Sequence, residues 1–378
     1  LNAVSVKYLW KVIKIIIIFN SSFVRKGNSY LTNNLNALFL KDLMFFGYEV
    51  SYFQFAFKNK YTISVFDLIA NGVKYKPLKN FRIKLINYIY AYLSIIPRII
   101  NNDFIYFYYP TSFKYATFFC ILLRKKYGLY IRGEKGIEDK TSLRIYKNAY
   151  TIFTVSDYFT EKINIVTERK LANTIRPMIP FTEKDIVFDR VYNINQSSKI
   201  LFLGRIAYDK GIEELLNAAS LLKKTGYRFV LDIVGNGKFI ENAKQITSNL
   251  NLSDTVKFHG PVYDIKEIKE FYSNADIYIL PTYHEGFPRT LYEAMIFGTP
   301  IITTLVGGIS SLMRDSYNCK SIESKSIEST FEGLKFAFQN YEKMIEFAKN
   351  ATNTVYSIVD SNKMTHAQHL DKILKNEE

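Results

Sequence analysis

The sequence contains few of the residues from which metal and redox sites are built. It has two cysteines, Cys120 and Cys319, which lie far apart and match no metal-binding spacing, and it has only four histidines. We therefore expect both cysteines to be buried free thiols in a reducing compartment. The chain also has no RNP motif, zinc finger or basic coiled coil, and this argues against a nucleic-acid-binding protein.

Long uncharged apolar runs are missing as well. A membrane-spanning helix needs about 20 predominantly apolar residues, and no stretch here provides them. The first apolar stretch, Tyr8 to Phe19, contains Lys11 and Lys14. Its four consecutive isoleucines, residues 15–18, favour a buried parallel strand over a signal peptide, and no small-residue cleavage site follows them. Whether Leu1 is the true start is left open.

The positive charge is concentrated in the first half of the chain. Residues 1–190 hold 29 Lys and Arg against 13 Asp and Glu, whereas residues 191–378 hold 21 against 22. Such a basic half suits an anionic membrane surface or an acceptor that bears a diphosphate. Within it, Lys74 to Ile100 mixes basic residues with Tyr, Phe and Ile, as interfacial amphipathic segments do. A core-packed helix with a solvated basic edge is an equally good interpretation.

The order of predicted elements indicates an α/β protein. A strand at Val12 to Phe19, a loop at 20–29, a helix from about Tyr30 to Phe46 and a strand at Glu49 to Phe53 make a βαβ beginning. The same alternation restarts at Lys199, and 378 residues suggest two domains. We predict a first domain at 1–180, a linker at 181–198, a second domain at 199–355 and a C-terminal helix within 356–378 that packs back on the first domain.

One stretch has the features of a ligand-binding junction. The apolar run at 276–280 is followed by a turn containing Gly286 and Pro288, and a helix begins near Thr290. The first turn of a helix has free N–H groups that suit a phosphate. Two carboxylates, Glu285 and Glu293, can accept paired hydrogen bonds from sugar hydroxyls. These features suggest a sugar nucleotide, although an ordinary helix start with surface acids has the same pattern.

A second junction precedes it in the chain. The strand at 199–203 runs into Gly204 and Arg205, and Lys210 and Gly211 follow in the same loop. Glycines let a phosphate approach the backbone closely, and two cations can neutralise the charge that develops on a departing nucleoside diphosphate. A plain strand-to-helix turn with surface charge is the alternative. Because both junctions follow strands of one expected parallel sheet, we expect them to face one crevice.

These two junctions, with the segment 298–308 that follows them, resemble the retaining glycosyltransferases of family 4, which have the GT-B fold. The resemblance is good over about 199–318, where Glu285 and Glu293 are separated by seven residues. Over the first half it rests on topology and on Gly27 in the first loop. It implies two Rossmann-like domains that face each other across a cleft, with the acceptor domain first and the donor domain second.

The resemblance also implies roles for individual residues. Arg205 and Lys210 would bind the donor diphosphate and act in catalysis with Glu285, which would contact the transferred sugar. Glu293 would bind the ribose. The remaining donor-site residues implied are Gly27, Gly204, Gly235, Val262, His284, Gly286, Phe287, Pro288, Arg289, Thr290 and Leu291. Such enzymes need no metal and no cofactor besides the nucleotide-sugar substrate.

The chain also departs from the family pattern. Lys26 and Gly27 stand where many relatives have two glycines, Arg132 stands near the place of a first-domain histidine, and Arg289 replaces a common asparagine. His284 is expected at the sugar or in packing. His366 and His369, which lie on the last predicted helix, are expected at the surface.

The interpretation that fits best is a transferase of bacterial surface polysaccharide biosynthesis. We expect a UDP-linked sugar donor, a lipid-linked glycan acceptor, no nucleic acid, and a cytoplasmic enzyme held peripherally on the inner face of the cell membrane. A GT-B enzyme with a soluble acceptor and a non-catalytic nucleotide-sugar-binding protein are the alternatives. The sugar, the linkage and the oligomeric state are not specified by the sequence.

Overall fold

The computed structural model describes residues 12–57, 66–133, 139–192, 198–286, 288–360 and 363–375. The chain divides into two compact units, and each is described by itself. The first contains residues 1–154, 160–175 and 365–378, and the second contains residues 155–159 and 176–364. The predicted linker at 181–198 and the predicted end of the second domain at 355 both fall inside the second unit. These domain boundaries stay predictions. Residues 193–197 of that linker lie outside the described residues.

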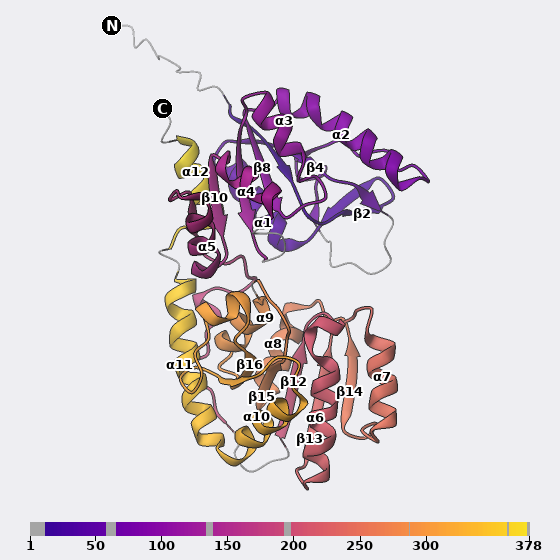
Figure 1. Ribbon diagram of the computed structural model, residues 1–378, viewed down its shortest axis with the longest axis vertical. Helices are drawn as coiled ribbons and strands as arrows, with labels where there is room; N and C mark the ends of the chain where they lie inside the picture. Colours follow the sequence, from indigo (N-terminus) through magenta and orange to yellow (C-terminus); the bar gives the residue numbers. More distant parts are fainter. Residues whose placement is uncertain are drawn as a thin grey trace, which may run out of the picture. The chain divides into compact units, whose positions relative to one another are not determined.

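The first unit is an α/β layer structure with a small added sheet (Figure 1). Its strands are β1 Lys14–Ile18, β2 Phe23–Lys26, β3 Ser29–Thr32, β4 Glu49–Phe53, β5 Ala56–Phe57, β6 Phe66–Asp67, β7 Lys74–Tyr75, β8 Phe104–Tyr109, β9 Lys126–Ile131, β10 Thr151–Thr154 and β11 Ala172–Thr174. Its helices are α1 Asn34–Phe45, α2 Lys84–Ile100, α3 Ala116–Leu122, α4 Lys140–Lys147, most of α5 Asp157–Thr167, and α12 His366–Lys375.

A seven-stranded parallel sheet in the order β11-β10-β9-β8-β1-β4-β7 forms the centre of this unit. The isoleucines of β1 are almost completely inaccessible to solvent, as expected of a central strand covered on both faces. This confirms the strand predicted at Val12 to Phe19. Cys120 is also a buried free thiol, as is Cys319 of the second unit.

The segment after β1 differs from the prediction. Residues 23–32 form a β-hairpin, in which β2 pairs antiparallel with β3 and Gly27 takes a φ of 61° in the turn. The hairpin uses Tyr30 to Thr32, so the helix predicted from Tyr30 begins only at Asn34, where the Asn33 side chain caps it. Likewise, the helical part of Lys74 to Ile100 begins at Lys84, because Lys74 and Tyr75 pair with β4 as a short strand.

The C-terminal helix α12 belongs to the first unit and packs against α1. The prediction that His366 lies at the surface is wrong. Its ring is buried among aromatic rings that include Phe39 and Tyr130, and its Nε2 lies 2.6 Å from the Tyr106 hydroxyl. Burial lowers the pKa of His366 well below its usual value. The imidazole is therefore a neutral core group.

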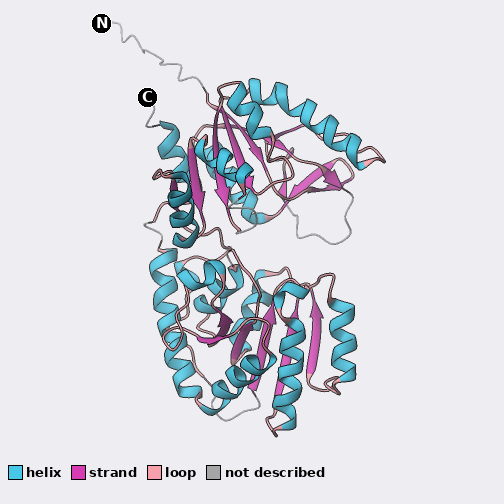
Figure 2. Ribbon diagram, in the orientation of Figure 1, coloured by secondary structure: helices cyan, strands magenta, loops and turns pink. Residues whose placement is uncertain are grey.

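The second unit has a six-stranded parallel sheet in the order β14-β13-β12-β15-β16-β17, with helices along both faces (Figure 2). Its strands are β12 Ser198–Leu203, β13 Phe229–Val234, β14 Val256–Gly260, β15 Ile277–Leu280, β16 Ile301–Thr304 and β17 Lys320–Ile322. Its helices are α6 Ile212–Lys224, α7 Ile240–Asn249, α8 Ile265–Asn274, α9 Arg289–Ile296, α10 Ile327–Gln339 and α11 Tyr341–Val359, with 3-10 turns η1 Glu183–Asp185, η2 Tyr208–Lys210 and η3 Gly307–Ser311.

Candidate donor site in the second unit

The site lies where β13, β12 and β15 end. These strands are neighbours in the parallel sheet, so the loops that follow their carboxyl ends meet at one edge. The Gly204 N–H donates to the Val234 carbonyl at 3.0 Å, and the Gly235 N–H donates to the Gly260 carbonyl at 2.8 Å. A Cβ on Gly235 would meet the Gly204 oxygen at 1.8 Å. Direct packing of backbone on backbone therefore fixes this edge.

An ion pair connects the two junctions that the sequence singled out. Lys210 Nζ, at the end of η2, bonds Glu285 Oε1 in the loop after β15, and lies 3.4 Å from the Thr282 hydroxyl. Both partners are shielded, with side chains only 10% and 20% exposed. Charges shielded from water interact more strongly with each other and with a bound ligand. The pair therefore fixes one cation and one carboxylate side by side at the edge of the sheet.

Asp209 is a second organising carboxylate, and the sequence analysis did not identify it. Its Oδ2 accepts from Arg205 Nη2 at 3.0 Å and lies 3.7 Å from His284 Nε2. Arg205 and His284 are both mainly exposed, at 64% and 68% of their side chains. Asp209 thus contacts two exposed nitrogen-bearing side chains, one in each of the loops that hold Lys210 and Glu285. The only sequence signal for it was the i,i+4 spacing from Arg205.

Thr282 is the other residue that the sequence did not reveal. Its side chain is fully buried, and its hydroxyl contacts the carbonyl oxygens of Asp209 and His284, each at 3.1 Å. One hydroxyl therefore ties the η2 turn to the loop that carries Glu285. No local pattern distinguishes such a threonine from any other residue that follows a strand.

The turn before α9 is closed by another glycine contact. Gly308 donates its N–H to the Glu285 carbonyl at 3.0 Å, and a Cβ on Gly308 would meet the Gly286 oxygen at 2.0 Å. Pro288 is buried and caps α9, and the N–H of Leu291 already donates to the Pro288 carbonyl at 3.0 Å. A phosphate at Leu291 would have to compete with that bond.

Glu293 lies inside the unit on α9. It is 7% exposed, and its Oε2 accepts from the Tyr272 hydroxyl at 3.0 Å. Burial raises the pKa of the Glu293 carboxyl to about 7, although the nearby Arg289 and the bond from Tyr272 oppose the rise. With a pKa of about 7, the Glu293 carboxyl is partly protonated near neutral pH, whereas a surface acid with an ordinary pKa is ionised there.

The remaining predicted residues are placed as follows. Val262 is half-buried against the core of the second unit, and the Thr290 hydroxyl is 2.7 Å from the Tyr278 hydroxyl. Arg289 is exposed at the start of α9. Phe287 lies outside the described residues. Gly27 belongs to the first unit, where it forms the exposed turn of the β2–β3 hairpin.

The first unit has its own polar group at a strand end. Arg132 follows β9, donates from Nη2 to the Asn20 side-chain oxygen at 3.1 Å, and lies over the rings of Tyr108 and Tyr130. Asn20 follows β1, so Arg132 reaches across the carboxyl edge of the sheet. Among the described residues, no cluster of three or more His, Cys, Asp or Glu side chains could hold a metal ion, and no helix is long and apolar enough to cross a membrane.

Residues 186–354 match the family described as Glycosyl transferases group 1. The group 1 match includes every donor-site residue predicted above except Gly27. It also includes Asp209 and Thr282, the two residues that only the structure revealed.

Several curated relatives of the chain are glycosyltransferases by name. An uncharacterized glycosyltransferase of Methanocaldococcus jannaschii is 28% identical over 61% of either chain. An N,N'-diacetylbacillosaminyl-diphospho-undecaprenol alpha-1,3-N-acetylgalactosaminyltransferase of Campylobacter jejuni is 27% identical over 53% of this chain. The present chain spans only 61% and 51% of the lengths of these relatives.

Solved structures show the same fold over nearly the whole chain. Anabaena HepE in complex with UDP has a TM-score of 0.69 at 16% identity, covering 97% of this chain and 99% of HepE. The apo form of the lipopolysaccharide outer core galactosyltransferase WaaB has a TM-score of 0.70 at 15% identity, covering 97% of this chain and all of WaaB. The predicted fold of two Rossmann-like units, that of GT-B glycosyltransferases, is confirmed.

Proposed function

We propose that this chain is a retaining glycosyltransferase of family 4 that uses a UDP-linked sugar as donor. The shielded Lys210–Glu285 pair is the observation that supports this best, because it joins a cation to a hydroxyl acceptor at the carboxyl edge of the second sheet. The group 1 match over residues 186–354 and the UDP bound to HepE support the same donor class.

The proposed chemistry assigns a task to each group. The bond between the anomeric carbon and the diphosphate breaks, and its electron pair leaves with the nucleoside diphosphate. Lys210 and Arg205 stabilise that developing charge. Glu285 accepts from the hydroxyls of the transferred sugar and Glu293 from those of the ribose. The acceptor hydroxyl bonds the anomeric carbon from the same face and gives its proton to the leaving phosphate. No metal is required.

A thermal-shift screen tests the donor class. A ligand that binds only the native state stabilises it, by about 2.7 kcal/mol when the ligand concentration is a hundred times Kd. The unfolding temperature rises accordingly. We expect UDP-sugars to raise it and free sugars to leave it unchanged. If no nucleotide sugar shifts the unfolding of the wild-type protein, the proposed donor class is wrong.

For the acceptor, we propose a lipid-linked glycan at the inner face of the cell membrane, used in surface polysaccharide synthesis. The named substrate of the Campylobacter jejuni relative is a diphospho-undecaprenol, and a Staphylococcus aureus relative is named for capsular polysaccharide biosynthesis. The surface of α2 supports this acceptor independently, because its outer side is apolar. That outer stripe consists of Leu85, Ile86, Ile89, Leu93, Pro97 and Ile100.

This stripe lies opposite the buried residues Ala91, Ile95 and Ile99. Leu85 and Leu93 are 67% and 65% exposed. A helix at a water-facing surface normally has polar residues on that side, so the stripe requires an apolar partner. The cations just before and at the start of the helix are Lys76, Lys79, Arg82 and Lys84. An anionic bilayer supplies both the apolar layer and the opposite charge.

Vesicle sedimentation tests this contact. The double change Leu85→Ser and Leu93→Ser removes two side chains worth roughly 1.5–3 kcal/mol each on full burial, so binding to phosphatidylglycerol vesicles should weaken at least about tenfold. The matched control is Val191→Ser, which changes an 85% exposed residue of the second unit. Equal sedimentation of all three proteins would favour the soluble-acceptor alternative.

A further inference from the structure

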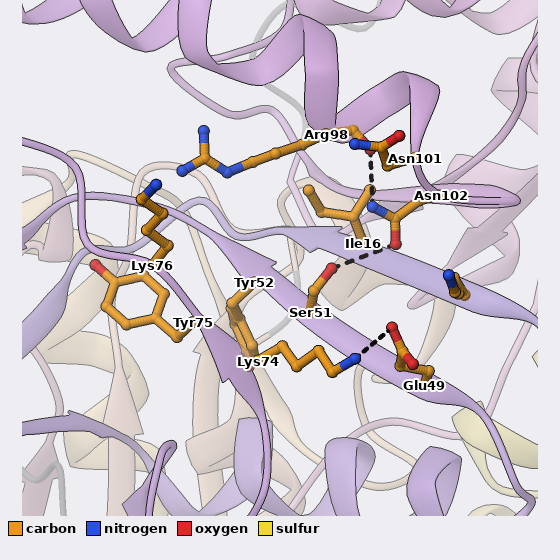
Figure 3. Close-up of a pocket in the computed structure, with 11 residues that line it drawn as sticks. Ile16, Glu49, Ser51, Tyr52, Lys74, Tyr75, Lys76, Arg98, Asn101 and Asn102 are labelled. Carbon is orange, nitrogen blue, oxygen red and sulfur yellow. Dashed lines mark hydrogen bonds and ion pairs between the residues drawn. The ribbon is translucent and has the colours of Figure 1, made fainter.

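The first unit contains a cationic pocket to which the proposed transferase reaction gives no role. It has a volume of about 590 Å³ and lies between the strands β1, β4 and β7 and the last turn of α2 (Figure 3). Sites for small molecules typically occupy about 300–1,000 Å³, so the pocket is large enough for one. Its charged lining residues are Lys14, Glu49, Lys74, Lys76 and Arg98.

The charges of the lining are unbalanced. The single carboxylate among these lining residues, Glu49, is already paired with Lys74 at 2.8 Å. Within the part of the chain that the structure describes, neither Lys76 nor Arg98 forms an ion pair with a carboxylate. Figure 3 shows the Arg98 guanidinium and the Lys76 ammonium directed toward the same part of the pocket.

Arg98 is held in place for this arrangement. Its Nη1 donates to the Ser94 carbonyl at 2.5 Å, and its guanidinium lies over the Phe53 ring, 5.2 Å from the centroid. Its half-burial lowers the pKa of the guanidinium, while the hydroxyls of Tyr90 and Tyr75 oppose the change. A partly desolvated cation without a carboxylate partner is costly to maintain, and an anion that enters the pocket would offset that cost.

From the convergence of Arg98 and Lys76 on one pocket, we propose that the first unit binds a phosphate-bearing anion there. A guanidinium takes a phosphate through two parallel hydrogen bonds, and an ammonium adds a compact charge. Asn101, which also lines the pocket, adds an amide group for a remaining oxygen. The anion is a free phosphate or pyrophosphate group, or the headgroup of an anionic lipid. In the sequence, Pro97 and Ile100 of the exposed α2 stripe lie one residue before and two residues after Arg98.

Calorimetric titration of the full chain with inorganic pyrophosphate, in saturating UDP to occupy the donor site, tests the proposal. The variants are Arg98→Gln and Lys76→Gln. Lys170→Gln is the control, because Lys170 is an exposed lysine of the first unit that neither lines the pocket nor lies near the start of α2 in sequence. Each pocket variant should bind pyrophosphate roughly ten to a hundred times more weakly than the control. Lys76 is exposed, so its replacement is not expected to disturb folding even if that of Arg98 does.

Vesicles of phosphatidic acid provide the second arm. If neither the wild type nor any variant binds pyrophosphate, but Arg98→Gln and Lys76→Gln both lose vesicle binding relative to Lys170→Gln, the phosphate comes from a lipid headgroup. If neither ligand distinguishes the pocket variants from the control, the proposal is overturned. The proposal does not depend on transferase activity. A separate titration of the Lys210→Ala protein with UDP tests the proposed donor site. If UDP binds this variant as it binds the wild type, the proposed donor site is wrong and the pocket proposal is unaffected.

Discussion

At the residue scale, two carboxylates organise the candidate donor site: Glu285 pairs with Lys210, and Asp209 pairs with Arg205. Lys210 and Glu285 each follow a strand of the same sheet, and this placement was legible in the sequence. Their ion pair, and the central position of Asp209 between Arg205 and His284, depend on side-chain directions that no local pattern encodes. His366 was misplaced for the same reason, since its partner Tyr106 is 260 residues away.

Glu293 gives a testable pH dependence. Its pKa is raised from 4.5 to about 7 in the folded protein. Between these two pH values the folded protein therefore keeps a proton on Glu293 that the unfolded chain has lost. Stability should therefore fall as pH rises from about 4.5 through 7, by roughly 1–3 kcal/mol from this group. Glu293→Gln should remove that loss and raise the unfolding temperature at pH 8, while weakening the binding of the donor.

Urea unfolding of both proteins at pH 5 and pH 8 checks this expectation. The difference in unfolding free energy between Glu293→Gln and wild type should be larger at pH 8. Glu342→Gln, on the first turn of α11, is the control for loss of a negative charge. If the difference is the same at both pH values, Glu293 is ionised in the folded state over this whole range.

At the element scale, the predictable parts are those with one dominant local signal. β1 and β4 were recognised from their apolar and β-branched content. The β2–β3 hairpin was missed although Gly27 and Asn28 are a recognised two-residue hairpin turn, because the loop was read as a ligand-binding loop. The start of α1 was predicted too early for the same reason, because the hairpin includes Tyr30. The apolar outer stripe of α2 could not be distinguished from a core face until the buried side was known.

Two glycines of the site should respond differently to alanine. A Cβ on Gly235 would meet backbone oxygen at 1.8 Å, and its φ of 142° strains any other residue. Gly235→Ala should cost at least ~2 kcal/mol of unfolding free energy. A Cβ on Gly204 meets only the Phe202 ring at 3.7 Å, which is ordinary contact. The unfolding free energy of Gly204→Ala should stay within ~0.5 kcal/mol of the wild-type value. This variant should instead bind UDP-sugars more weakly than wild type.

Chemical unfolding and donor titration of the two variants together make the comparison. Equal loss of stability in both would mean that Gly204 is needed for the fold rather than for close approach of a phosphate. Unchanged donor affinity in a stable Gly204→Ala protein would remove Gly204 from the site.

At the scale of the whole molecule, the two units differ in charge and in their match to the group 1 family. The excess of basic residues lies in the first 190 residues, which include the exposed stripe of α2 and the Arg98 pocket. The group 1 match lies in the second unit, which holds the proposed donor site. The division of charge follows from the composition, and the repeated alternation of strand and helix predicted two α/β domains. The GT-B fold itself was predicted from the resemblance of residues 199–318 to family 4. The sequence also predicted a C-terminal helix that packs back on the first domain, but it could not indicate that α12 contacts α1, because that contact depends on the path of the whole chain.

The most direct test of the central claim is donor hydrolysis, measured as release of UDP from the UDP-sugar that binds best in the thermal-shift screen. Lys210→Ala is compared with Lys257→Ala, a control on the exposed side of β14. We predict that Lys210→Ala lowers the rate by about a hundredfold or more, because it removes a cation from the leaving diphosphate, and that Lys257→Ala is unchanged. Hydrolysis by Lys210→Ala at the wild-type rate would contradict the account.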